Sequence, residues 1–141
     1  KVEQATPEDT NVIFHIGSCL AELGQYEEAA NYFFKLDFIE SNCIKAWRGI
    51  GWCSFISRKY EQAMKYYEQI IKQKPLAIDY MNAGPVAWTM GDIQKAAALY
   101  GKSITANGNR ERFLEMFRKD KEALLKQGIQ EEDIPLMLDL L

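Results

Sequence analysis

The sequence predicts an all-α fold made of stacked helical hairpins, and three observations support this class. A pattern of aromatic and small residues in the segment 24–36 returns 34 residues later in the segment 58–70. Part of the same pattern returns once more after a further 33 residues. Within each copy, the apolar residues have the spacing of amphipathic helices. Internal repeats of this length are typical of solenoids, in which each unit buries its apolar faces against its neighbours.

The repeated positions are occupied by small residues and by aromatic ones. The equivalent residues are Gly17, Gly51 and Gly84; Ala29, Ala63 and Ala96; and Phe33, Tyr67 and Tyr100. Each copy is predicted to contain two helices, separated in the second copy by a break at 57–59 and followed by Pro75, which cannot continue a helix. The small residues allow the two helices of a pair to approach closely.

This pattern resembles the tetratricopeptide repeat (TPR) family. The second copy carries most of that family's motif: Trp47, Ile50-Gly51, Tyr60, Ala63, Tyr67, Ile70 and Pro75. The first and third copies carry parts of it. In the first copy, Ile13 stands in place of the usual aromatic residue and Ser41 in place of the closing proline. The resemblance covers roughly residues 1–108. It implies a right-handed superhelix with a concave groove, formed by the first helix of each repeat.

The spacing divides the chain into five parts. Residues 9–43, 44–76 and 77–108 are predicted to form TPR-like repeats 1, 2 and 3, and residues 109–141 to form C-terminal capping helices. Pro7 lies at a repeat-closing position. We therefore expect residues 1–8 to be the tail of a truncated upstream repeat, with a cut surface at that end.

Two segments depart from the regular pattern. Pro85 lies in the middle of a predicted helix, where it removes a hydrogen bond, and we expect a bend or a widened turn there. The tail 131–141 carries more apolar side chains than one face of a short helix can hold. We expect it to fold back on the capping helices, with contact to another chain as the alternative.

Composition favours a binding protein over an enzyme. The 17 Lys/Arg are scattered among 20 Asp/Glu, which argues against nucleic acid as a partner. No apolar run is long enough to cross a membrane. Three cysteines and the single His15 are too few for a zinc site or a disulfide framework, and no phosphate-binding motif occurs. We expect no catalytic residues, cofactor or metal, and a cytoplasmic protein.

The resemblance places a partner-binding site on the first helices of the repeats. Carried over position by position, the candidates are Phe14, Lys45, Arg48, Trp52, Phe55, Met81, Pro85 and Trp88. Aromatic and cationic side chains together suit an extended or helical protein segment that carries an acidic group. The alternative is that Phe55 and Trp88 pack between neighbouring helices. The carboxylate clamp of some family members is not expected, because Phe14 and Ile78 stand where it would need cations.

The function predicted is a non-catalytic scaffold that binds a peptide or helical segment of another protein in the concave groove. One alternative is a structural or oligomerisation segment that self-associates through the truncated N-terminal end or the apolar C-terminal tail. A weaker resemblance, to the TPR-like chaperones of type III secretion, suggests a secretion-chaperone-like module. An active site, if there is one, would have to lie upstream of Lys1.

Overall fold

The computed structural model describes residues 9–141, which form helices and contain no strand. The predicted tail of an upstream repeat, including Pro7, lies outside these described residues. The helices are α2 (Thr10–Glu22), α3 (Tyr26–Ile39), α4 (Ile44–Ile56), α5 (Tyr60–Ile71), α6 (Ala77–Thr89), α7 (Ile93–Asn107), α8 (Arg110–Lys119), α9 (Lys121–Lys126) and α10 (Asp133–Asp139). The predicted all-α class is confirmed.

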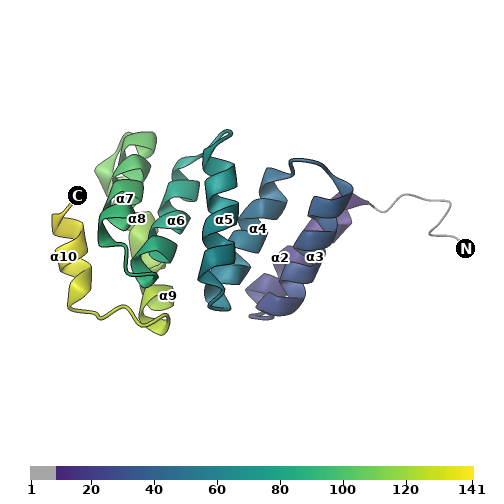
Figure 1. Cartoon of the computed structure of the whole chain (residues 1–141), viewed down its shortest axis with the longest axis horizontal. Helices are drawn as coiled ribbons and strands as arrows, with labels where there is room; N and C mark the ends of the chain where they lie inside the picture. Colours follow the sequence, from purple (N-terminus) through teal and green to yellow (C-terminus); the bar gives the residue numbers. More distant parts are fainter. Residues whose placement is uncertain (1–8) are drawn as a thin grey trace, which may run out of the picture.

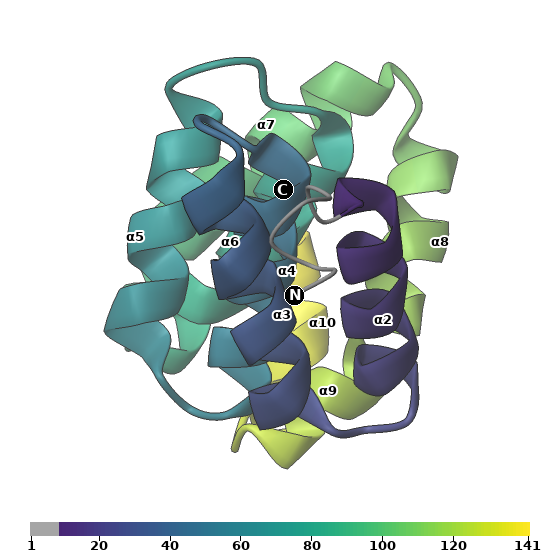
Figure 2. The same cartoon turned by 90° about the vertical axis from the view of Figure 1, so that its right-hand side faces the viewer.

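The helices form three stacked hairpins and a C-terminal extension. Helices α2 and α3, α4 and α5, and α6 and α7 pack as pairs, and each pair contacts the next along the chain. Figure 1 shows the pairs side by side in sequence order, with α8 behind α7 and α10 at the far end. Viewed from the N-terminal end, α2 and α8 lie on one side of the molecule and α5 on the other (Figure 2).

A glycine of the first helix faces an aromatic ring of the second helix in every hairpin. A Cβ atom added to Gly17, Gly51 or Gly84 would lie 2.9, 2.9 or 2.7 Å from the nearest ring atom. The rings belong to Phe33, Tyr67 and Tyr100, which follow their glycines by the same interval in all three hairpins. Non-bonded carbon atoms prefer about 3.5–4.0 Å, so a larger residue would push the helices apart.

The turn inside each hairpin uses a left-handed backbone at one equivalent position. Gly24 and Gly91 have φ values of 82° and 89° there, and Arg58 takes the same place in the second hairpin with φ 65°. A side chain in this region of φ is strained, which glycine avoids. Arg58 therefore marks a turn that is held by other contacts, and its guanidinium donates to the Lys126 carbonyl at 3.2 Å.

The C-terminal extension continues the core of the hairpins. Asn109 caps α8 through its side chain, and Gly108 ends α7 in the left-handed region, as glycine commonly does. Phe113 and Phe117 of α8 contact the ring of Tyr100. Ile134 and Met137 of α10 are buried in the same core cluster, so the last helix folds back as expected.

Pro85 does not interrupt its helix. Helix α6 runs continuously from Ala77 to Thr89, and Pro85 is buried within it. The predicted widened turn is therefore wrong.

Candidate functional site

All eight candidate residues lie on the first helices of the hairpins, but the structure divides them into a buried and an accessible group. The buried group consists of Phe55, Met81, Pro85 and Trp88. Phe55 and Met81 are 0% exposed and belong to the largest core cluster. The expected exposure of these four side chains is therefore contradicted. Phe55 and Trp88 are buried, and their rings contact Tyr60 of α5 and Tyr100 of α7.

The accessible group consists of Phe14 on α2 and of Lys45, Arg48 and Trp52 on α4. The ammonium of Lys45 lies 4.9 Å from the centroid of the Phe14 ring, within the range of a cation–π interaction. Phe14 also packs against Phe33 of α3, with the two ring centroids 6.0 Å apart. Neighbouring first helices thus present an aromatic ring with a cation above it.

Arg48 is engaged in an ion pair and is not a free cation. Its guanidinium donates to both carboxylate oxygens of Asp79, at 2.6 and 2.9 Å. Asp79 is 0% exposed and also accepts from the Leu76 amide at the start of α6. The hydrogen bond to Asp79 raises the pKa of Arg48. Arg48 therefore ties α4 to α6, and Lys45 is the cation of the accessible group that a ligand can pair with.

The C-terminal extension covers the end of α4 that follows Trp52. Gln127 donates from Nε2 to the Ile56 carbonyl at 3.2 Å and accepts a short hydrogen bond from the Tyr60 hydroxyl. A cleft of about 170 Å³ remains where α8 and α9 approach Tyr26, Trp52 and Ile56. The expected open groove is therefore partly occupied by the chain itself.

Three buried polar atoms beneath this extension have no hydrogen-bond partner among the described residues. They are the hydroxyls of Tyr67 and Tyr100 and Oδ2 of Asp120. Burial raises the pKa of Asp120 to about 6. Burial is also the main cause of the raised pKa of both tyrosines, and the negative charge of Asp120 raises each pKa further. The junction between α8 and α9 thus places a carboxyl group close to two buried phenols.

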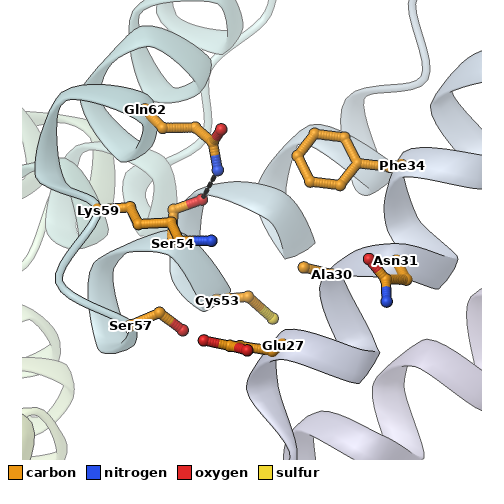
Figure 3. A pocket seen from close by; sticks show the side chains of 9 residues that line it. All are labelled: Glu27, Ala30, Asn31, Phe34, Cys53, Ser54, Ser57, Lys59 and Gln62. Carbon is orange, nitrogen blue, oxygen red and sulfur yellow. Dashed lines mark hydrogen bonds between the residues drawn. The ribbon is translucent and has the colours of Figure 1, made fainter.

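A second cleft, of about 150 Å³, lies between α3 and the hairpin of α4 and α5 (Figure 3). Gln62 donates to the Ser54 hydroxyl at 2.8 Å on one side of it, and Glu27 approaches from the other. Cys53 lies within this cleft, but burial raises the pKa of its thiol to about 11. A thiol that stays protonated at neutral pH is a poor nucleophile.

Features of other kinds of site are absent from the part of the chain that the structure describes. Residues 9–141 contain no group of three or more His, Cys, Asp or Glu side chains placed to hold a metal ion. None of the helices in this range is both long and apolar enough to span a bilayer.

Comparison with known proteins agrees with the geometry. Residues 10–36 and 44–75 match the family model described as tetratricopeptide repeat. The predicted resemblance to tetratricopeptide repeats is therefore confirmed for these two segments. Proteins of this family are generally non-catalytic interaction modules. The third hairpin, α6 and α7, lies outside the two matches but repeats their glycine–aromatic contact.

Solved structures with the same fold share little sequence with this chain. The crystal structure of MamA is 19% identical, with 89% of this chain and 82% of that chain covered and a TM-score of 0.67. MamA 41-end from Desulfovibrio magneticus RS-1 is 16% identical, with 98% and 78% covered and a TM-score of 0.72. YrrB, described as a TPR protein with an unusual peptide-binding site, is 16% identical, with 99% and 76% covered and a TM-score of 0.69. No curated protein sequence matches.

Proposed function

We propose that this chain is a non-catalytic scaffold that binds a segment of another protein on its first helices, next to Phe14, Lys45 and Trp52. The observation that carries the proposal is the pair of Lys45 and Phe14 on adjacent helices, with the half-buried ring of Trp52 on the same helix as Lys45. Partly exposed aromatic rings beside a cation are typical anchor points for protein segments.

The arrangement of the repeats also supports the proposal. Stacked TPR hairpins expose a long row of first helices, and one protein with this fold is described by its peptide-binding site. Because Gln127 and its neighbours cover the end of α4, the surface left for a partner lies toward α2 and the start of α4. A ligand with an acidic side chain or a terminal carboxylate would pair with Lys45 and contact Phe14.

A selection experiment tests this proposal. Peptides selected from a displayed random library on the wild-type chain would be tested again on Lys45→Glu and on Lys65→Glu. Lys65 is the matched control, because it is an exposed lysine 5.9 Å from the Tyr66 ring on the second helix α5. We expect Lys45→Glu to weaken binding at least tenfold and Lys65→Glu to leave it unchanged. Equal binding to both variants would refute the site.

The second candidate function is self-association. Val12 and Ile16 are exposed apolar side chains of α2, the first helix of the described residues. A second copy of the chain could cover this face. Light scattering across a range of concentrations separates the candidates: a dimer that Ile16→Glu dissociates favours self-association, and a monomer excludes it.

We propose a cytoplasmic location, and the three free thiols of Cys19, Cys43 and Cys53 support this proposal. Free cysteines, one of them exposed, fit a reducing compartment.

A further inference from the structure

A second apolar surface lies away from α2 and α4, between the last helix and the turn that joins α6 to α7. The cleft there has a volume of about 510 Å³. Its lining consists of Trp88, Ile93, Asp133, Leu136, Met137, Asp139 and Leu140. Trp88 and Met137 are buried, so they form the base of the cleft, whereas Ile93 is 43% exposed.

Two leucines in the last helix segment are exposed to solvent, although Ile134 and Met137 of α10 are buried. Leu136 is 61% exposed and Leu140 is 62% exposed, while Ile134 and Met137 are buried in the core. Short helices gain stability by burying one apolar stripe, and a second stripe left exposed next to a cleft indicates a surface that another element covers.

The polar residues of this cleft are both acidic. Asp133 is the first residue of α10 and Asp139 is the last, and neither forms an ion pair within the described part of the chain. The cleft lining contains no basic residue, and two ion pairs of the described residues that involve lysine, Lys95 with Glu68 and Lys121 with Glu131, use different acids. The cleft therefore presents an apolar base with two uncompensated negative charges at its ends.

We propose that this cleft binds an amphipathic helix of a partner protein that carries lysine or arginine. Its apolar side chains contact Leu136, Leu140 and Ile93, and its cations pair with Asp133 and Asp139. Asp139 follows Asp133 by six positions, which corresponds to about 9 Å along the axis at 1.5 Å per residue. Basic residues two turns apart on one face of the partner helix, at positions i and i+7, are about 10.5 Å apart along its axis, and their long side chains can span the small difference.

This surface is independent of the site on α2 and α4. Its residues come from α6, α7 and α10, and none of them belongs to the accessible group of Phe14, Lys45, Arg48 and Trp52. A partner could occupy the cleft whether or not a peptide binds to the first helices.

The test is a peptide selection on the wild-type chain, followed by removal of the peptides that also bind a variant of the cleft. A displayed library of helix-forming 14-residue peptides is selected on the wild-type chain and then depleted on the triple variant Asp133→Asn/Leu136→Ser/Asp139→Asn. All three positions are exposed, so the variant should keep the fold, which circular dichroism checks. We expect surviving peptides to have apolar residues on one face and lysine or arginine seven positions apart. If no peptide survives depletion, or if survivors lack basic residues, the proposal is overturned.

Binding of one surviving peptide is then measured by fluorescence anisotropy. Exposed charge pairs contribute little individually, so Asp133→Asn/Asp139→Asn should weaken binding about fivefold and reduce its salt dependence. Glu111→Gln/Glu115→Gln on α8 is the matched control and should change nothing, and Lys45→Glu should change nothing either. If Asp133→Asn/Asp139→Asn binds the peptide as tightly as the wild type does, the proposal is overturned. It is also overturned if the free chain is a dimer that Leu136→Ser dissociates, because the cleft is then occupied by a second copy of the chain.

Discussion

Replacing Asp120 by asparagine should stabilise the protein at neutral and alkaline pH. One carboxylate oxygen, Oδ2, is buried and has no hydrogen-bond partner among the described residues, and burial raises the pKa of the group from 3.8 to about 6. A raised pKa means that folding favours the protonated form. The stability that this preference provides is fully present below pH 3.8 and is lost as the pH rises through about 6. Above that, the charged carboxylate lies in a poorly solvated position.

The size of the effect follows from the pKa values. One pKa unit corresponds to about 1.4 kcal/mol, so the ionised carboxylate costs at most about 3 kcal/mol at pH 8. Part of this cost is already present at pH 5, because an aspartate of the unfolded chain is ionised there. The free energy of unfolding of Asp120→Asn should therefore exceed that of the wild type by about 1–1.5 kcal/mol more at pH 8 than at pH 5.

Urea unfolding followed by tryptophan fluorescence at both pH values measures this difference. Glu115→Gln, which removes an exposed acid from α8, the helix that ends at Asp120, is the control and should show no such difference between the two pH values. If Asp120→Asn is no more stable than the wild type at pH 8, or if its advantage does not depend on pH, the carboxylate is not a destabilising buried charge and the reasoning fails.

Three further outcomes follow from the packing and the ion pair. Gly51→Ala should lower the stability measured by thermal unfolding by about 1–3 kcal/mol, because the added Cβ would lie 2.9 Å from the Tyr67 ring. Gly101→Ala should be neutral or stabilising, because no atom lies within 4 Å of the Cβ that it adds. Arg48→Met should cost about 2–4 kcal/mol in urea unfolding, since it leaves a buried carboxylate without its partner, and a loss below about 0.5 kcal/mol would contradict that role. In native protein at pH 7.5, a thiol reagent should label exposed Cys19 rapidly and Cys53 only after unfolding; equally rapid labelling would mean that Cys53 is not buried.

The hairpins could be predicted from the sequence because their determinants are local and repeated. The equivalent glycines and aromatic residues recur at a fixed interval, and in the structure each pair makes the same contact. Helix ends follow short-range signals in the same way: Asn109 accepts hydrogen bonds from the amides of Glu111 and Arg112 at the start of α8, and Gly128 has a φ of 100° shortly after the end of α9.

Exposure of the site residues could not be predicted, because it depends on contacts between distant segments. Phe55 and Trp52 lie three positions apart on one helix, yet the first is fully buried and the second is half-buried. The partner-facing positions that the family resemblance assigns assume an open row of first helices. They contain no information on where residues 109–127 pack. Gln127 reaches Ile56 across 71 positions of sequence, and no periodic pattern signals such a contact.

The charges of the site were missed for the same reason. Asp79 lies in the first turn of α6, where acidic residues are common, and it accepts a hydrogen bond from the Leu76 amide. Its ion pair with Arg48 spans 31 positions, and it removes the cation on which the predicted acidic ligand partly depended. Asp120 gave no signal at all, since its burial arises only when α8 and α9 pack over α5 and α7.

The central claim is that a partner protein binds next to Phe14 and Lys45. Site-specific photo-crosslinking in the native cell tests it most directly, with a photoreactive amino acid placed at position 45 and, as the control, at position 65 on α5. The account predicts that position 45 becomes linked to one defined polypeptide through a short segment of its chain, and that position 65 does not. If both positions give the same products, or if position 45 gives none, the first helices are not a binding surface and the claim is wrong.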